Sequence, residues 1–234
     1  MKPEVHAIIV AAGKGVRMGD AVRKQYIVLD GIPVLTRTLG LFNQCDRIDR
    51  ILLAVPIDDI DFCRDEILPD AGRHKEIHLV SGGTRRQDSV YNCLETIDAN
   101  DGIVLIHDGV RPFLKMEHLI ACIDGAQKYG ACILGIPAFD TVKHVNTQNE
   151  ITQTQQRDTL WLAQTPQAFR LKLIKKAHKK ARQDGFIGTD DASLVERLGA
   201  VVKIIPGSRS NIKITDPEDL KLANAILKSG SEVP

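Results

Sequence analysis

The order of apolar and polar residues along the chain predicts an α/β protein. Short runs rich in β-branched residues have the character of strands buried on both faces, and they fall at residues 8–10, 50–56, 77–80, 103–106, 132–136 and 201–205. Stretches with apolar residues at helical spacing separate most of these runs. Apolar strands that alternate with amphipathic helices favour a mostly parallel sheet with helices on both faces.

The predicted helices cover residues 33–42, 58–68, 87–97, 116–128, 171–183 and 194–198. A further helix is predicted to begin at Asp216, because an N-cap aspartate there precedes a proline and two acidic residues. Asp190 is a second candidate N-cap. Residues 161–169 are instead expected to form a connection that carries candidate site residues.

Residues 140–158 interrupt this pattern. The segment is polar, alternates at Val142, His144 and Ile151, and has a turn-like Asn-Thr-Gln-Asn stretch at its middle. Its apolar residues are too few to face a core, so we predict a β-hairpin arm that projects from the body and needs a partner. The alternative is a mobile surface loop, although a long polar segment inside a compact domain is usually functional or involved in assembly.

Composition excludes several classes of protein. Lysine and arginine total 31 against 30 for aspartate and glutamate, so the chain lacks the overall basic field that sequence-independent nucleic-acid binding requires. No apolar run approaches the ~20 residues of a membrane span, and the first residues do not resemble a signal peptide. Five cysteines without paired spacing suggest reduced, buried thiols. We therefore expect a cytoplasmic protein with no membrane or nucleic-acid partner.

The first predicted strand leads into a glycine-rich loop with the sequence AAGKGVRMG. Glycines at 13, 15 and 19 let backbone N–H groups approach a ligand, and Lys14, Arg17, Arg23 and Lys24 supply positive charge. The spacing matches neither the dinucleotide fingerprint nor the P-loop. A left-handed turn between a strand and a helix is the alternative, but the flanking cations favour a polyphosphate site.

Three turns rich in candidate site residues follow predicted strands, at Gly13, at Gly82 and at Asp108. In parallel sheets the carboxyl ends of the strands form the ligand site, so we expect these turns to meet in one crevice.

The residue inventory also limits the chemistry. The chain has no Gly-x-Ser-x-Gly elbow for serine hydrolysis, and its seven histidines are dispersed without metal-ligand spacing. His107 is the one histidine beside a candidate site, and a histidine at a strand end is more often structural than catalytic. Phosphoryl or nucleotidyl transfer requires little beyond positioning and fixed cations, often with Mg²⁺ on the phosphates.

Eight motifs, in order, carry a family resemblance. They are AAGKGVRMG at 11–19, KQY at 24–26, SGGTRRQDSV at 81–90, HDGVRPF at 107–113, DTVK at 140–143, QTPQAF at 164–169, TDDAS at 189–193 and NIK at 211–213. Together they resemble the 2-C-methyl-D-erythritol 4-phosphate cytidylyltransferases, over nearly the whole chain. The resemblance implies a single Rossmann-like nucleotidyltransferase domain over 1–234, with 140–158 as a β-hairpin dimerisation arm. It also implies conversion of CTP and methylerythritol phosphate to CDP-methylerythritol and pyrophosphate.

The resemblance assigns catalytic roles to four basic residues. Arg17 and Lys24 would stabilise charge at the α-phosphate, and Lys213 would lie beside them. Arg157, in the arm, would act in the neighbouring subunit of a homodimer. The acceptor phosphate is expected to attack the α-phosphorus in line, with Mg²⁺ held mainly by the CTP phosphates and no metal ligand assigned to a protein side chain.

Substrate contacts follow from the same motifs. For the nucleotide the resemblance implies the triphosphate loop Ala11, Ala12, Gly13 and Gly15, the cytosine contacts Gly83 and Ser89, and Asp108 near the ribose. For the acceptor it implies Asp108, Arg111, Thr141, Thr165 and Thr189.

Two alternatives stay open. Gly109-Val110 replaces the more common Ala-Ala pair, and valine there also occurs in ribitol 5-phosphate cytidylyltransferases, whereas TDDAS and the region of Arg157 resemble the methylerythritol enzymes more closely. The other alternative is a non-catalytic nucleotide or sugar-phosphate sensor on the same fold. Retention of Arg17, Lys24 and Lys213 argues against a sensor.

Overall fold

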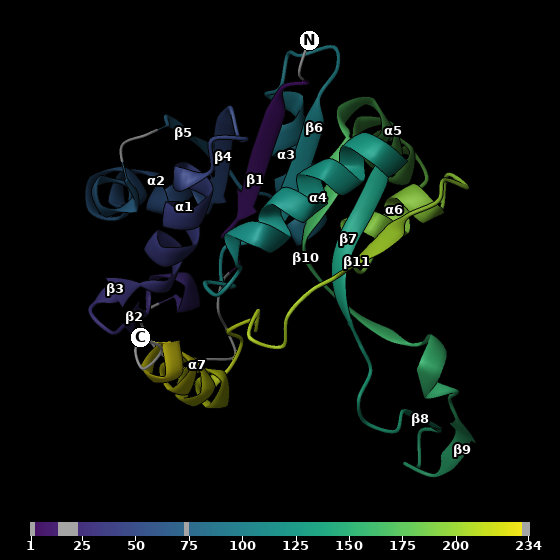
Figure 1. Ribbon diagram of the computed structural model, residues 1–234. Coiled ribbons are helices and arrows are strands. Elements are labelled where there is room, and N and C mark those ends of the chain that lie inside the picture. Colours follow the sequence, from purple (N-terminus) through teal and green to yellow (C-terminus); the bar gives the residue numbers. More distant parts are fainter. Residues whose placement is uncertain (1–2, 14–22, 73–74, 231–234) are drawn as a thin grey trace.

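A seven-stranded, mostly parallel sheet forms the centre of the protein. This computed structural model describes residues 3–13, 23–72 and 75–230. The strand order is β11-β7-β10-β6-β1-β4-β5, and only β10 runs antiparallel to its neighbours (Figure 1). The strands are β1 (Val5–Val10), β4 (Arg50–Val55), β5 (Ile77–Ser81), β6 (Ile103–Asp108), β7 (Ala131–Pro137), β10 (Trp161–Arg170) and β11 (Lys203–Pro206). The predicted fold class is confirmed.

Helices cover both faces of the sheet. Alternate residues of β1 point to opposite faces, so Ile9 packs in the core beneath α1 and α4, and Ile8 packs in the core beneath α3, α5 and α6. In Figure 1, α4 lies in front of the strands, and α3 lies behind them. The helices are α1 (Val34–Gln44), α2 (Ile60–Phe62), α3 (Arg86–Glu95), α4 (Met116–Tyr129), α5 (Leu171–Gln183), α6 (Asp191–Glu196) and α7 (Pro217–Gly230).

The prediction of a connection over residues 161–169 was wrong, because this segment is the central strand β10. Its middle is buried although it carries Gln164, Thr165 and Gln167. Each polar side chain has partners: Gln164 donates to the Ser208 carbonyl, and Gln167 accepts from the backbone N–H groups of Asp191 and Ala192. Satisfied buried amides are compatible with a strand, but they hide the apolar pattern from which a strand is recognised.

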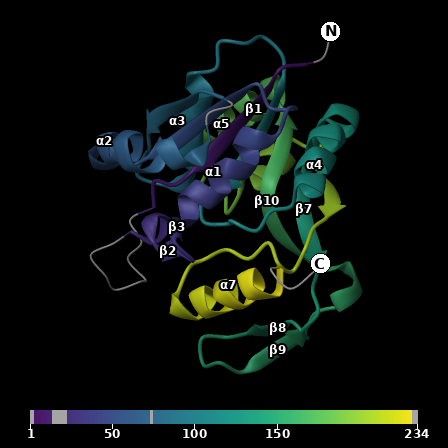
Figure 2. The same cartoon turned by 60° about the vertical axis from the view of Figure 1, so that its left-hand side comes forward.

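A small third core packs α7 against the turn that follows β6. Leu29, Val34, Val110, Ile214 and Ala223 bury one another between α7 and the short hairpin of β2 (Val28–Leu29) and β3 (Ile32–Pro33). The Ile214 amide donates to the Val110 carbonyl at 2.9 Å. Figure 2 shows α7, in yellow, close to β2 and β3. This core holds the residue before Ile214, which is Lys213, beside the turn after β6.

Residues 140–158 form the projecting hairpin that the sequence predicted. Strands β8 (Lys143–Val145) and β9 (Ile151–Thr154) pair antiparallel, and the Asn146 side chain accepts from two backbone N–H groups in the turn. Figure 1 shows this arm extending away from the sheet. Val145 and Ile151 are 54% and 64% exposed, so the arm leaves apolar side chains uncovered.

Other local predictions were mostly confirmed. Asp190 and Asp216 both accept from N–H groups in the first turns of their helices, and the five cysteines are buried and unpaired. Residues 57–71 are helical but irregular, with successive 3₁₀, α and π turns.

In the described part of the chain, no helix combines the length and apolarity that crossing a membrane demands.

Candidate active site

The turns after β1, β5 and β6 meet in one cleft of about 640 Å³. This confirms the expectation that the three turns converge, and its cause is the parallel register, which aligns Val10 with both Ala54 and Asp108 at the carboxyl edge. The lining includes Ala11, Ala12, Gly13, Arg23, Lys24, Asp58, Gly82, Gly83, Arg85, Arg86, Ser89, Asp108, Val110 and Lys213. Five of these side chains are cationic, so the cleft suits a polyanion.

The loop after β1 forms one wall of the cleft. Gln25 is buried and donates to the Ala11 carbonyl at 2.8 Å, which ties the start of the loop to the short helical turn Lys24–Tyr26. That turn places Lys24 in the cleft. Gly15 and Arg17 lie outside the described residues.

The glycine pair after β5 lines the cleft next to this loop. A Cβ on Gly82 would lie 2.2 Å from the Ala12 Cβ, and a Cβ on Gly83 would lie 2.3 Å from the Asp88 Cβ. A glycine at 82 therefore lets the turn pack against the first loop, and a glycine at 83 lets it pack against the start of α3. The Gly83 N–H donates to Ser89 Oγ at 3.0 Å, and Ser89 donates to the Arg85 carbonyl. Ser89 thus fixes the turn as well as lining the cleft.

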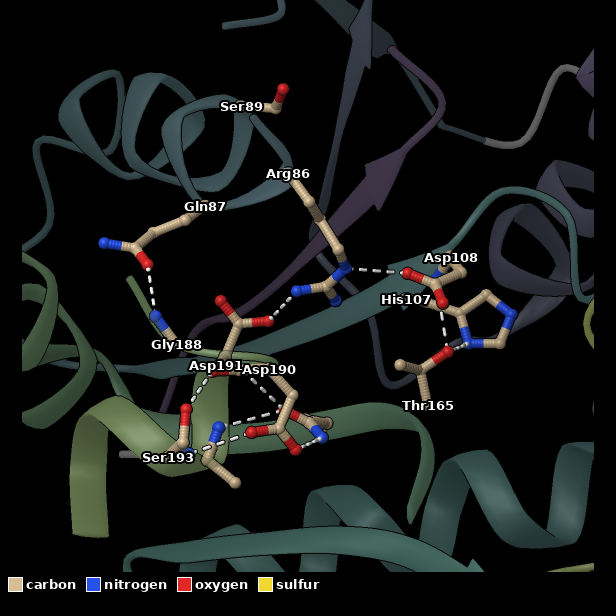
Figure 3. A network of polar contacts seen from close by, with 12 residues as sticks. Arg86, Gln87, Ser89, His107, Asp108, Thr165, Gly188, Asp190, Asp191 and Ser193 are labelled. Atoms are coloured by element: carbon tan, nitrogen blue, oxygen red, sulfur yellow. Dashed lines mark hydrogen bonds and ion pairs between the residues drawn. The ribbon is translucent and has the colours of Figure 1, made fainter. Parts of the chain in front are cut away.

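Asp108 lies at the floor of the cleft, where β6 ends. Its Oδ1 accepts from Arg86 Nε at 2.9 Å (Figure 3). Its Oδ2 is 2.8 Å from Lys213 Nζ and 3.7 Å from Arg111 Nε. Burial alone would raise the pKa of the Asp108 carboxyl, but the charges of Arg86 and Lys213 outweigh it and hold that pKa well below its ordinary range. Asp108 is therefore ionised.

His107 is structural, as its position at a strand end indicated. The buried ring packs with Nε2 3.1 Å from the Arg111 carbonyl and Nδ1 3.1 Å from Thr165 Oγ1. Because a carbonyl can only accept, we assign the proton to Nε2, and Thr165 then donates to Nδ1. Burial lowers the pKa of His107 to about 4, so the ring is neutral near pH 7. A neutral imidazole with both nitrogens engaged is poorly placed to act as a base.

The residues assigned to the acceptor are spread more widely. Thr165 is buried beneath the cleft, where its hydroxyl accepts from the Asp108 N–H at 3.1 Å. Arg111 donates to the Asn211 carbonyl and lies beside Asp108. Thr189 is exposed and is absent from the cleft lining. None of the three residues lines the cleft, but Arg111 and Thr165 both contact Asp108 at its floor.

The arm residues lie in a separate place. Thr141 is exposed. Arg157 donates to the Phe139 carbonyl at 2.9 Å and lines a second hollow at the base of the arm together with Arg209. Neither residue lines the cleft of its own chain.

Sequence reasoning missed the salt bridges behind Asp108. Arg86 spans Asp108 and Asp191, and Asp191 also pairs with His178 at 3.0 Å. One signal was available: Arg86 is the first residue of α3, and a cation at the positive end of a helix is unfavourable unless a carboxylate compensates it.

The cleft offers few side-chain ligands for a metal ion. Among the residues that the structure describes, no cluster of three or more histidine, cysteine or acidic side chains forms a metal site. Two carboxylates, Asp58 and Asp108, line the cleft, and Asp108 is already paired with cations. Mg²⁺ usually takes one or two carboxylates with substrate phosphates and waters, which this cleft can accommodate.

Comparisons with known proteins identify the family of this chain. The model of the 2-C-methyl-D-erythritol 4-phosphate cytidylyltransferase family matches residues 5–229. A relative of that name from Syntrophus aciditrophicus is 51% identical over 228 residues, which cover 97% of each chain. Another from Geobacillus kaustophilus is 48% identical, covering 95% of this chain and 96% of the relative.

Solved structures give the same result. The crystal structure of 4-diphosphocytidyl-2C-methyl-D-erythritol synthase from Anaerococcus prevotii superposes with a TM-score of 0.87 at 37% identity, covering 97% of each chain. The 2-C-methyl-D-erythritol 4-phosphate cytidylyltransferase from Thermus thermophilus has a TM-score of 0.76 at 31% identity, covering 97% of this chain and all of the other. This chain therefore belongs to the 2-C-methyl-D-erythritol 4-phosphate cytidylyltransferase family.

Proposed function

We propose that the protein transfers a cytidylyl group from CTP to 2-C-methyl-D-erythritol 4-phosphate, producing CDP-methylerythritol and pyrophosphate. The observation that carries this proposal is the meeting of two glycine turns with Lys24 and Lys213 in one cleft. Glycine turns give a triphosphate close contact with backbone N–H groups, and fixed cations stabilise the charge that accumulates at the α-phosphorus.

The reaction needs no general base in this site. The second pKa of a phosphate monoester is about 6, so the acceptor phosphate is already largely dianionic at neutral pH. The obstacle is repulsion between a dianion and a polyanion. Lys24 and Lys213, together with Arg17, counter this repulsion, and the neutral, engaged His107 takes no part in proton transfer.

We assign the substrates to different parts of the cleft. The loop of Ala11, Ala12, Gly13 and Gly15 holds the triphosphate, the turn of Gly83 and Ser89 reads the cytosine, and Asp108 lies near the ribose. Mg²⁺, when bound to the triphosphate, neutralises charge on the leaving pyrophosphate. The acceptor then lies toward Arg111, Thr165 and Thr189.

The arm is assigned to a homodimer. Val145 and Ile151 are uncovered, and Arg157 does not line the cleft of its own chain; both observations support exchange of arms between two subunits. Thr141 and Arg157 would then complete the acceptor site of the partner subunit. The five free, buried thiols also support a cytoplasmic location.

The identity of the acceptor is the point on which the family resemblance leaves an alternative. Val110 is buried in the third core against Ile214 and also lines the cleft, so packing alone explains a valine there. The valine at 110 therefore gives no reason to prefer ribitol 5-phosphate as the acceptor.

Pyrophosphate release tests this function. With CTP, Mg²⁺ and 2-C-methyl-D-erythritol 4-phosphate, release should be fast, whereas UTP and ATP should be poor donors, because a pocket that pairs the cytosine edge rejects bases that leave its polar groups unpaired. Faster release with ribitol 5-phosphate would identify a ribitol enzyme. CTP binding without release from either acceptor would identify a sensor.

Removal of a transfer cation should affect turnover more than binding. We expect Lys24→Ala and Lys213→Ala each to lower kcat by about 10² to 10³, with a much smaller change in the Kd for CTP, because one such electrostatic group acts mainly in the transition state. Lys24→Arg should rescue poorly, since a planar fork does not replace a point charge. Lys221→Ala, on the exposed side of α7, is the control. A collapse of CTP affinity with turnover retained would show that these lysines only bind the ground state.

Exchange of arms predicts complementation between two inactive variants. Lys24→Ala damages its own site, and Arg157→Ala damages the partner's site, so each mixed dimer contains one intact site. Random mixing of equal amounts makes about half of the dimers mixed and should restore roughly a quarter of wild-type activity. If no activity returns although mixed dimers form, Arg157 serves its own subunit.

A further inference from the structure

Arg86 connects the cleft to a second carboxylate behind it. As the first residue of α3, it extends across the carboxyl edge of the sheet, with Nε 2.9 Å from Asp108 Oδ1 and Nη1 2.6 Å from Asp191 Oδ2. Figure 3 shows the guanidinium between the two carboxylates. Burial opposes the charge of Arg86, but Asp191 and Asp108 together raise its pKa, so the group is always charged.

Asp108 is shared between Arg86 and Lys213. The two cations use different carboxylate oxygens, Oδ1 for Arg86 and Oδ2 for Lys213. Lys213 is 36% exposed and lines the cleft, so its ammonium group has further N–H donors to offer a phosphate. The strength with which Asp108 holds Lys213 therefore depends on how much of the Asp108 charge Arg86 compensates.

Asp191 fixes the other end of Arg86. It is buried, with Oδ1 3.0 Å from His178 Nε2, and Gln167 accepts from its backbone N–H. The neighbouring Asp190 has a different task, since its side chain caps α6 through the Ser193 N–H. Of these two neighbouring residues, Asp190 therefore caps a helix and Asp191 pairs with Arg86.

We propose that Arg86, held by Asp191, is a positioning residue that sets the place and the available charge of Lys213 during cytidylyl transfer. The inference rests on the proposed function. If Arg86 did not share Asp108, the full carboxylate charge would draw Lys213 toward the cleft floor. It would also oppose the negative charge that develops at the α-phosphorus. If Asp191 did not hold Arg86, the guanidinium would be free to turn toward Asp108 alone.

The first test compares three conservative variants. Arg86→Lys keeps one positive charge but loses the fork that spans two carboxylates, and Asp191→Asn keeps the shape of the side chain but removes its charge. We expect Arg86→Lys to lower kcat by about 10- to 100-fold, the size expected for a misplaced catalytic group. Asp191→Asn should act in the same direction, and both variants should change the Kd for CTP much less. Asp184→Asn is the matched control, because it removes the same charge from an exposed pair with Arg197.

A double-mutant cycle then separates positioning from a purely structural or direct role. If Arg86 acts through Lys213, adding Arg86→Lys to Lys213→Ala should cost little more than Lys213→Ala alone. A structural role, or a separate contact with substrate, would instead multiply the two losses. Where Arg86→Lys fails to fold, as judged by thermal melting, Asp191→Asn takes its place in the cycle.

The outcomes of these tests also distinguish a failure of the positioning role from a failure of the proposed function. A wild-type protein that releases no pyrophosphate from CTP and methylerythritol phosphate contradicts the proposed function. An active wild type whose losses multiply in the cycle overturns the positioning role alone. So does an Asp191→Asn variant that behaves like Asp184→Asn.

Discussion

The buried carboxylate of Asp108 is the interaction on which the site depends. It draws together three cationic side chains from separate parts of the chain: Arg86 at the start of α3, Arg111 after β6 and Lys213 before α7. Without an anion at this point, three cations would repel one another across the cleft floor. Asp108 lies at the end of a strand inside the sheet, and its backbone N–H donates to Thr165. The sheet therefore holds in place the cations that pair with Asp108.

This arrangement serves placement more than stability. A buried ion pair gains Coulomb energy but loses hydration, so its net contribution to folding is commonly small, whereas removal of one partner costs about 3 to 5 kcal/mol. Cations held in place before substrate arrives need little reorganisation during the reaction, which is the main source of electrostatic catalysis. The same pairs that add little to stability therefore suit a site that must receive two phosphorylated substrates.

The sequence predicted most of the strands and the projecting hairpin, because local residue pattern specifies them. Strands such as β6 are continuous apolar runs, and the hairpin of β8 and β9 is a polar segment with its own turn residues, so local pattern specifies both. Strand β10 was missed because Gln164 and Gln167 are satisfied only by residues distant in sequence, and no local pattern reports such partners. The links from Arg86 to Asp191 and from Asp191 to His178 were missed for the same reason. The meeting of the three turns was predictable, since it follows from the parallel topology.

The motifs indicated the chemistry of the site, but the structure shows that several motif residues have structural tasks. Ser89 fixes the glycine turn, Thr165 holds Asp108, and Asp190 caps a helix. Residues assigned to substrate and residues that hold them in place are interleaved within the same motifs. A substitution at either kind of position would reduce activity, so kcat and Kd must be measured separately.

The most direct test of the central claim is the titration of the Asp108 carboxyl, followed by ¹³C NMR in the free protein over the pH range in which the fold is intact. A free aspartate titrates near pH 3.9. The pairing with Arg86 and Lys213 predicts a midpoint well below that value. Since the folded pKa is lowered, the stability that the pairing contributes is complete above the unfolded pKa and is lost as the pH falls through the folded one. A carboxyl that stays ionised below pH 3.9 would support the account, and a midpoint at or above that value would contradict it.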